Sequence, residues 1–193
     1  MKALEEKILK DGEVIGTEIV KVDGFINHRI DVKFMDEMGC EFARLFKDAK
    51  PNKILTVEAS GIAIAVSSSR CFGYIPVVFA KKAAPNTMTE GAYEAEARSF
   101  TKGTVSILHV SKKHLEKGDR VLILDDFLAH GEAGLALCDI VEQAGAQVVG
   151  LGAAIEKTYQ GGAERLRARG ITVKSLAAIA KIEDGKVTFG ESV

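Results

Sequence analysis

Two adjacent carboxylates, Asp125 and Asp126, end the aliphatic run RVLILDD (120–126). Four consecutive aliphatic residues precede them, which is typical of a strand that is covered on both faces of a sheet. The next residues, FLAHGEAG, predict a short loop that opens a helix near Gly131. At the carboxyl end of such a strand, helix N–H groups favour a phosphate, and neighbouring carboxylates suit ribose hydroxyls or a magnesium ion. The segment therefore predicts a site for a sugar phosphate.

The spacing of this segment also permits plainer interpretations. Asp125 and Asp126 are equally consistent with polar residues at a strand end, one of which caps the following helix. Receiver and phosphatase domains share the order of strand, acid, loop and helix. These alternatives stay open on spacing alone.

The elements that must position these residues alternate between strands and helices. The stretch 1–13 predicts a charged amphipathic helix, and apolar residues at helical spacing predict another over 31–48. A strand at 53–58, a small-residue helix at 60–72 and a strand at 74–80 form a unit of the length that a parallel crossover needs. The later chain repeats the pattern, with expected elements at 120–126, 132–144, 147–157, 161–169, 171–183 and 186–189. This alternation predicts a doubly wound α/β domain with a mostly parallel central sheet flanked by helices.

The segment 83–119 interrupts the alternation. Residues 83–100 are polar and rich in small side chains, 104–110 predict a strand, and 111–119 predict a charged turn. An excursion of this length between core strands is more often functional than idle. We therefore expect a lid or a dimer arm here.

The composition is that of an ordinary globular chain of 193 residues, with 47% hydrophobic and 27% charged residues. This length favours one domain over 1–193. The 26 Lys and Arg residues nearly balance the 27 Asp and Glu residues, so we expect neither nucleic acid nor a membrane as a partner. No apolar run reaches the roughly 18 residues that span a bilayer, and the N-terminus lacks the apolar centre of a signal peptide.

The three cysteines, Cys40, Cys71 and Cys138, are odd in number and far apart. Because none belongs to a C-x-x-C pair, we expect neither a disulfide framework nor a zinc site. Cys40 and Cys138 fall within helical patterns and are expected to be small buried side chains. A reduced, cytoplasmic setting fits this pattern best.

The paired acids followed by small residues and glycine resemble the phosphoribosyl-diphosphate signature of type I phosphoribosyltransferases. Further segments resemble those of the purine enzymes of this family that use xanthine, and they occur in the same order: KVDGFINHRID (21–31), VEASGIA (57–63), VVFAKK (77–82), SFTKGT (99–104) and AAIEKTYQGG (153–162). The resemblance covers essentially the whole chain. It implies the type I phosphoribosyltransferase fold with a small hood subdomain, formed by about 1–30 and the C-terminal strands. It also implies a flexible lid at about 83–110, in which Lys102 is a candidate cation.

The resemblance implies transfer of the 5-phosphoribosyl group from 5-phosphoribosyl 1-diphosphate to xanthine, which gives XMP and diphosphate in purine salvage. It also implies Mg²⁺, bound mainly through the substrate, and a homodimer. Two alternatives remain. One is a hypoxanthine or guanine phosphoribosyltransferase. The other is a non-catalytic regulator that senses phosphoribosyl diphosphate, for which we would expect a DNA-binding segment or a basic face.

The resemblance assigns catalytic roles to Asp125 and Asp126, as negative charge and hydroxyl acceptors beside the ribose. The residues that it implies for binding phosphoribosyl diphosphate are Ala129, His130, Gly131, Glu132 and Ala133. Many family members have Thr-Gly-Gly-Thr here, so this chain lacks the threonine hydroxyls that assist the phosphate. Backbone amides must therefore do more, while His130 can donate a hydrogen bond and Glu132 should point away from the phosphate.

Ser60, Gly61 and Lys81 are the residues implied for the diphosphate. Ser60 and Gly61 lie where a strand ends and a helix opens, so backbone amides there can meet a diphosphate. The alternative is that Ser60 caps the helix and Gly61 permits close packing. Lys81 and Lys82 end the next strand and could neutralise diphosphate oxygens, although a solvated pair is equally consistent for one of them.

The resemblance places xanthine against Val20, Asn27 and Lys157. Val20 would supply an apolar wall, but its alternative role in the core is the simpler one. Asn27 is equally consistent with a turn residue, and Lys157 with a solvated strand end. Tyr159 could stack on the base, although an aromatic residue there is more often packing alone.

Overall fold

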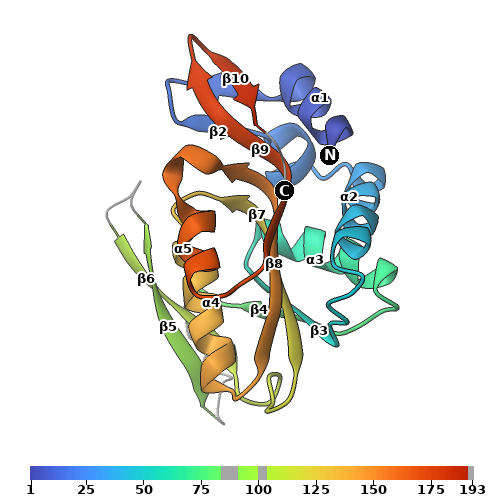
Figure 1. The fold of residues 1–193 in the computed structure, drawn as a ribbon, viewed down its shortest axis with the longest axis vertical. Coiled ribbons are helices and arrows are strands. Elements are labelled where there is room, and N and C mark those ends of the chain that lie inside the picture. The colour runs from blue at the N-terminus through green and yellow to red at the C-terminus, as the bar shows by residue number, and fades with distance from the viewer. Residues whose placement is uncertain (84–90, 100–103, 191–193) are drawn as a thin grey trace.

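A six-stranded sheet forms the centre of the protein (Figure 1), and the computed structural model describes residues 1–83, 91–99 and 104–190. The strands are β3 (Lys53–Val57), β4 (Val77–Ala80), β7 (Arg120–Leu128), β8 (Gln147–Lys157), β9 (Val173–Glu183) and β10 (Lys186–Phe189). They lie in the order β10-β9-β8-β7-β3-β4. Within this sheet β3, β4, β7, β8 and β9 pair in parallel, and β10 runs antiparallel to β9. The predicted mostly parallel sheet is confirmed.

Helices cover both faces of the sheet, as Figure 1 shows. They are α1 (Lys2–Asp11), α2 (Val32–Leu45), α3 (Ser60–Cys71), α4 (Glu132–Gln143) and α5 (Gly162–Ala168). Successive side chains of a strand point to opposite faces of the sheet. Those of β7 therefore pack against helices on both faces. Leu122 and Leu124 pack with α1, α2 and α3, whereas Val121 and Ile123 pack with α4 and α5. Within the described ranges, none of the helices is long and apolar enough to cross a bilayer.

Short elements near the N-terminus carry one of the predicted site residues. Strands β1 (Glu13–Ile15) and β2 (Ile19–Lys21) form an antiparallel hairpin, and a π-helical turn over Asp23–Asn27 follows. Asp31 then caps α2 by accepting a hydrogen bond from the Phe34 N–H at 3.2 Å. Because Phe25 and Ile26 are buried while Asn27 is exposed, the turn anchors its apolar side and presents Asn27 outward.

A second antiparallel hairpin, β5 (Ala92–Ser99) and β6 (Thr104–Ser111), lies beside α4. It joins the edge of the main sheet through reciprocal backbone hydrogen bonds between Lys81 and His109, at 2.9 and 2.8 Å. The predicted strand at 104–110 is confirmed, but β5 was not predicted. Its alternation of half-buried and exposed residues is regular, yet it uses Ala and Glu, which are depleted in strands. Residues 84–90 and 100–103 of the predicted lid, including Lys102, lie outside the described residues.

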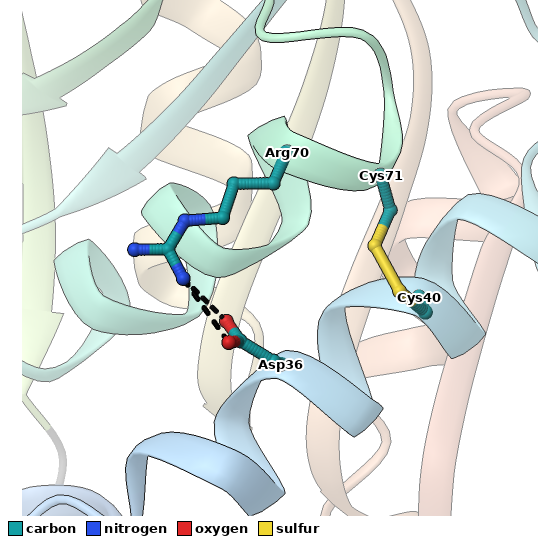
Figure 2. Close-up of a disulfide and its surroundings, with 4 residues drawn as sticks. All are labelled: Asp36, Cys40, Arg70 and Cys71. Carbon is teal, nitrogen blue, oxygen red and sulfur yellow. Dashed lines mark hydrogen bonds and ion pairs between the residues drawn. A yellow bond between two sulfur atoms is a disulfide. The ribbon is translucent and has the colours of Figure 1, made fainter.

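The prediction that the chain has no disulfide is wrong, because Cys40 and Cys71 form one with a Cα–Cα distance of 5.2 Å (Figure 2). The two residues are 31 positions apart in sequence, but α2 and α3 pack side by side. Gly39 allows this approach, since a Cβ there would lie 2.7 Å from the backbone of Ser67.

Cys40 is exposed rather than buried, so that expectation is also wrong. Its helical spacing indicated α2 correctly but did not show which face of the helix it occupies. An ion pair between Arg70 and Asp36, at 2.9 Å, joins the same two helices next to the disulfide (Figure 2). The expected burial of Cys138 is confirmed.

Candidate active site

The candidate site lies where the strand order of the sheet reverses. The strands β4 and β8 lie on opposite sides of the β3–β7 pair, which makes this pair the topological switch point at which open α/β sheets bind ligands. The loop 58–61 follows β3, and Asp125 and Asp126 lie in the last part of β7. A Cβ on Gly61 would lie 3.2 Å from Asp125 Oδ1, so the loop backbone runs directly beside this carboxylate.

Asn27 connects three parts of the predicted site. Its side-chain amide donates a hydrogen bond to Ser60 Oγ at 3.1 Å and another to Asp126 Oδ2. Asn27, Ser60 and Asp126 come from three distant segments that sequence reasoning assigned to the base, the diphosphate and the ribose. The structure therefore brings these three residues together at one point.

The two carboxylates differ in their surroundings. Burial, followed by the charge of Asp126, raises the pKa of Asp125 well above its usual value. Asp125 Oδ1 accepts a hydrogen bond from the Asp126 backbone N–H at 2.9 Å, which opposes this rise only in part. Asp125 is thus held in a site that disfavours its ionised form until a positive charge comes near.

The loop 129–133 lines one side of a cavity of about 170 Å³ at the start of α4. Gly131 has φ +81°, in the left-handed region that favours glycine, and a Cβ there would lie 3.0 Å from the Gly162 carbonyl oxygen. The Gly162 N–H also donates to the Ala129 carbonyl at 3.1 Å. The start of α5 therefore braces the loop through backbone contacts.

Glu132 lines this cavity, and its charge is offset by Arg165. Arg165 Nη1 donates to Glu132 Oε1 at 2.5 Å and to the His130 carbonyl at 2.6 Å. His130 Nδ1 lies 3.3 Å from the Gln160 carbonyl oxygen. Glu132 thus lines the cavity with its carboxylate paired to Arg165, and its orientation relative to a bound phosphate stays a prediction.

A second cavity, of about 410 Å³, lies against the loop after β3 and next to the first. Residues 57–61 and Lys82 line one side, and Asp125 and Asp126 another. Both cavities are lined by Arg98, Asp125, Glu132 and Ala133, so they adjoin one another at Asp125.

The structure separates the two lysines at the end of β4. Lys82 lines the second cavity, and its backbone N–H donates to Glu58 Oε1 at 2.7 Å. Lys81 does not line either described cavity; its Nζ lies 5.9 Å from the centre of the Phe79 ring. The geometry thus favours Lys82 over Lys81 as a cation for a ligand in this cavity.

Lys157 lies at the end of β8, the strand that pairs with β7. Its Nζ donates to the Glu18 carbonyl at 2.5 Å and lies 5.8 Å from the centre of the Phe127 ring. Burial lowers the pKa of Lys157. Val20 is buried in the core, as its simpler interpretation held, while Tyr159 is 42% exposed.

Three residues of this site were not proposed from the sequence. Phe127 follows the acid pair directly, but its apolar side chain indicates only a continuation of the strand. Arg98 and Arg165 reach the site from β5 and α5, and no motif marks either arginine. Only the three-dimensional arrangement identifies them.

Comparison with known proteins agrees with this geometry. Residues 38–184 match the family model "Phosphoribosyl transferase domain". The chain belongs to this family. It is 51% identical over 189 residues to the xanthine phosphoribosyltransferase of Bacillus cytotoxicus, covering 98% of this chain and 95% of that protein. It is 50% identical to the xanthine phosphoribosyltransferase of Clostridioides difficile, covering 98% of this chain and 100% of that protein.

Solved structures agree on the fold. The adenine phosphoribosyltransferase of Rhodothermus marinus matches with a TM-score of 0.73 and 20% identity, over 93% of this chain and 100% of that one. The adenine phosphoribosyltransferase of Leishmania donovani matches with a TM-score of 0.73 and 22% identity, over 91% of this chain and 80% of that one. The predicted type I phosphoribosyltransferase fold is confirmed.

Proposed function

We propose that this protein is a xanthine phosphoribosyltransferase, which transfers the 5-phosphoribosyl group of 5-phosphoribosyl 1-diphosphate to xanthine in purine salvage. The observation that carries the proposal is the position of Asp125, which lines both adjoining cavities, beside Asp126, which lines the second and is bonded to Asn27. Relatives with this printed name and about 50% identity over nearly the whole chain support the choice of xanthine.

The two cavities suit the two ends of the phosphoribosyl substrate. The cavity at loop 129–133 opens at the start of a twelve-residue helix, where free N–H groups and the helix dipole favour the 5-phosphate. The cavity at loop 58–61 contains Lys82 and suits the diphosphate. A substrate that spans both cavities would place its ribose beside Asp125 and Asp126, whose oxygens can accept its hydroxyl hydrogens.

The acid pair stabilises the ribose as the bond to diphosphate breaks. By analogy with glycoside chemistry, the ribose passes through a transition state with oxocarbenium character. Positive charge that develops on the ribose favours the ionised forms of Asp125 and Asp126. Because burial and Asp126 raise the pKa of Asp125, its carboxylate is stabilised more by that developing charge than a well-solvated carboxylate would be.

The residues of the site fit a magnesium ion that binds mainly through the substrate. Among the described residues, no group of three or more His, Cys, Asp or Glu side chains could hold a metal by itself. Mg²⁺ prefers oxygen ligands and is commonly bound by one or two carboxylates together with substrate phosphates. Asp125 and Asp126 are the carboxylates placed to support it, and the ion would offset charge on the leaving diphosphate.

The base would lie near Asn27, Lys157 and Phe127. Xanthine has oxygens at positions 2 and 6 and is partly anionic near neutral pH, so donors and positive charge favour it. Lys157 and Asn27 can supply both, once Lys157 exchanges the Glu18 carbonyl for the ligand. Phe127 offers an apolar ring beside the lysine. Val20 belongs to this proposal only as an apolar wall behind the site.

We also propose that the protein is a homodimer in the cytoplasm. Each chain would form a single domain over 1–193, with a hood made of about 1–30 and the C-terminal strands. A lid would lie at about 83–110. Contacts of α1 with β9 support the hood, and the β5–β6 hairpin supports a separate covering segment. Sedimentation should give about twice the chain mass of 20.7 kDa. A single 20.7 kDa species at micromolar concentration would refute the dimer.

The proposed reaction is tested by following both products. The protein, Mg²⁺, phosphoribosyl diphosphate and xanthine should yield XMP and diphosphate in equal amounts. Omission of Mg²⁺ should abolish both products. Binding of phosphoribosyl diphosphate without product from any purine would instead support the sensing regulator.

A further inference from the structure

Arg98 lines both cavities of the site, although it comes from the β5–β6 hairpin outside the main sheet. We propose that its guanidinium binds the 5-phosphate of the phosphoribosyl substrate. The inference rests on the proposed function and deepens it, because it names a side-chain ligand for a phosphate that otherwise depends on backbone amides.

The charges around the cavity at loop 129–133 support this role of Arg98. Its lining contains two carboxylates, Asp125 and Glu132. Among its described lining residues, Arg98 is the one side chain that carries a permanent positive charge. Arg165 also lies near the loop, but its guanidinium is bonded to Glu132 and to the His130 carbonyl and does not line the cavity. A phosphate dianion in this cavity would therefore meet its permanent positive charge, among the described lining residues, at Arg98.

The side chains of the loop itself also leave this role to Arg98. The segment Ala129-His130-Gly131-Glu132-Ala133 has no hydroxyl side chain that could donate to a phosphate oxygen. An arginine presents five N–H donors in a planar fork that matches phosphate geometry. Arg98 is exposed, and no described residue is bonded to its guanidinium. Its donors are thus free to meet a ligand.

The strand that carries Arg98 is fixed by packing against α4. Ala97, its neighbour on β5, packs against the cluster that contains α4, and Gln143 of α4 donates to the Glu94 carbonyl at 2.8 Å. The hairpin is therefore fixed to the same helix whose start forms the phosphate cavity. Arg98 and the loop are held at a set separation by α4, which favours direct binding over a chance approach of a surface side chain.

Binding of two fragments of the substrate tests the proposal. Ribose 5-phosphate carries only the 5-phosphate, and inorganic diphosphate carries only the other end. In calorimetry with the full-length protein, Arg98→Gln should weaken ribose 5-phosphate binding at least about tenfold, because hydrogen bonds between charged groups are the stronger class. Diphosphate binding should change much less. Arg98→Lys should restore part of the loss, since it keeps the charge without the fork.

Lys112→Gln is the matched control. It removes one positive charge from the same hairpin, but Lys112 lies against the Tyr93 ring, 5.5 Å from its centre, and lines neither described cavity. This variant should bind both fragments as the wild type does. If Arg98→Gln and Lys112→Gln weaken ribose 5-phosphate binding equally, the effect is one of general charge and the proposal is overturned.

The outcomes distinguish failure of the Arg98 assignment from failure of the proposed function. If Arg98→Gln weakens diphosphate and spares ribose 5-phosphate, the assignment to the 5-phosphate is wrong. If both fragments bind Arg98→Gln and wild type equally, Arg98 has no phosphate role, while the proposed function stands. If wild type binds neither fragment nor phosphoribosyl diphosphate, the proposed function fails and this inference fails with it.

Discussion

Arg165 and Glu132 form an ion pair at 2.5 Å between α5 and the loop 129–133, which we propose binds the 5-phosphate. The same arginine nitrogen donates a hydrogen bond to the His130 carbonyl. One side chain therefore both positions the loop backbone and offsets the charge of Glu132. This pairing explains how a loop that should bind a phosphate can contain a glutamate.

Arg165→Gln should raise the KM for phosphoribosyl diphosphate by about tenfold while kcat changes little. The variant leaves the Glu132 carboxylate unpaired beside the phosphate cavity, where it repels the substrate. Steady-state kinetics with varied phosphoribosyl diphosphate measure the effect. The double variant Arg165→Gln with Glu132→Gln should recover most of the lost affinity, because it removes the repelling charge as well. If the double variant is as impaired as the single one, charge pairing is not the role of Arg165.

Asp125→Asn should lower turnover by about a hundredfold or more and yet raise thermal stability. Turnover falls because the amide has no charge to stabilise the ribose in the transition state. Stability rises because burial and Asp126 disfavour the ionised carboxylate in the folded protein. We expect Tm to increase by at least about 2 °C, the shift that 1 kcal/mol gives in a chain of this size.

The pH dependence checks the cause of that stability change. With a folded-state pKa above the unfolded-state value, the contribution of Asp125 to stability is fully present below the unfolded-state pKa and is lost as pH rises through the folded-state pKa. The Tm difference between variant and wild type should therefore be largest at neutral pH and shrink in acid. An Asp125→Asn protein no more stable than wild type at neutral pH contradicts this account of its environment.

Gly131→Val should raise the KM for phosphoribosyl diphosphate strongly, by about tenfold or more. The φ of +81° strains a β-branched residue, and its Cβ would lie 3.0 Å from the Gly162 carbonyl. His130→Ala keeps the backbone intact and should do less. Kinetics on the two variants compare backbone with side-chain recognition, and a larger effect of His130→Ala would reverse this assignment.

Reduction of the Cys40–Cys71 disulfide should lower the free energy of unfolding by about 3–4 kcal/mol, as chain entropy predicts for a separation of 31 residues. Urea unfolding with and without a reductant measures the loss, and Cys40→Ser should show the same value. A thiol reagent should find no reactive thiol in the native oxidised protein and two after reduction. Cys138 should react only after unfolding, because burial raises its pKa to about 12. Two reactive thiols without reductant would show that the disulfide is absent.

Much of the fold could be predicted because the strands of a doubly wound sheet are continuous apolar runs. The four aliphatic residues before Asp125 identify β7 and therefore place the acid pair at a strand end. Sequence periodicity could not show that Cys40 faces Cys71, because the packing of α2 on α3 depends on Gly39 and on long-range contacts. β5 was missed because its alanines and glutamates carry little strand signal.

The site was predictable to the extent that it follows strand ends. Ser60 and Asp126 were proposed at strand ends and Asn27 from the family resemblance, and the structure joins the three. Lys82 rather than Lys81 lines the cavity, because neighbouring residues near a strand end point in different directions. Arg98 and Arg165 depend on how the hairpin and α5 pack, which no local pattern encodes.

The central claim is the choice of xanthine, and kcat/KM for the four purine bases with wild type and Lys157→Ala tests it most directly. We predict that wild type prefers xanthine over guanine at least about tenfold, prefers it further over hypoxanthine, and does not use adenine. Lys157→Ala should narrow the ratio of xanthine to guanine, because the lost ammonium favours the anionic base more than the neutral one. A wild-type preference for guanine or hypoxanthine contradicts the account, and an unchanged ratio in Lys157→Ala removes this lysine from base selection.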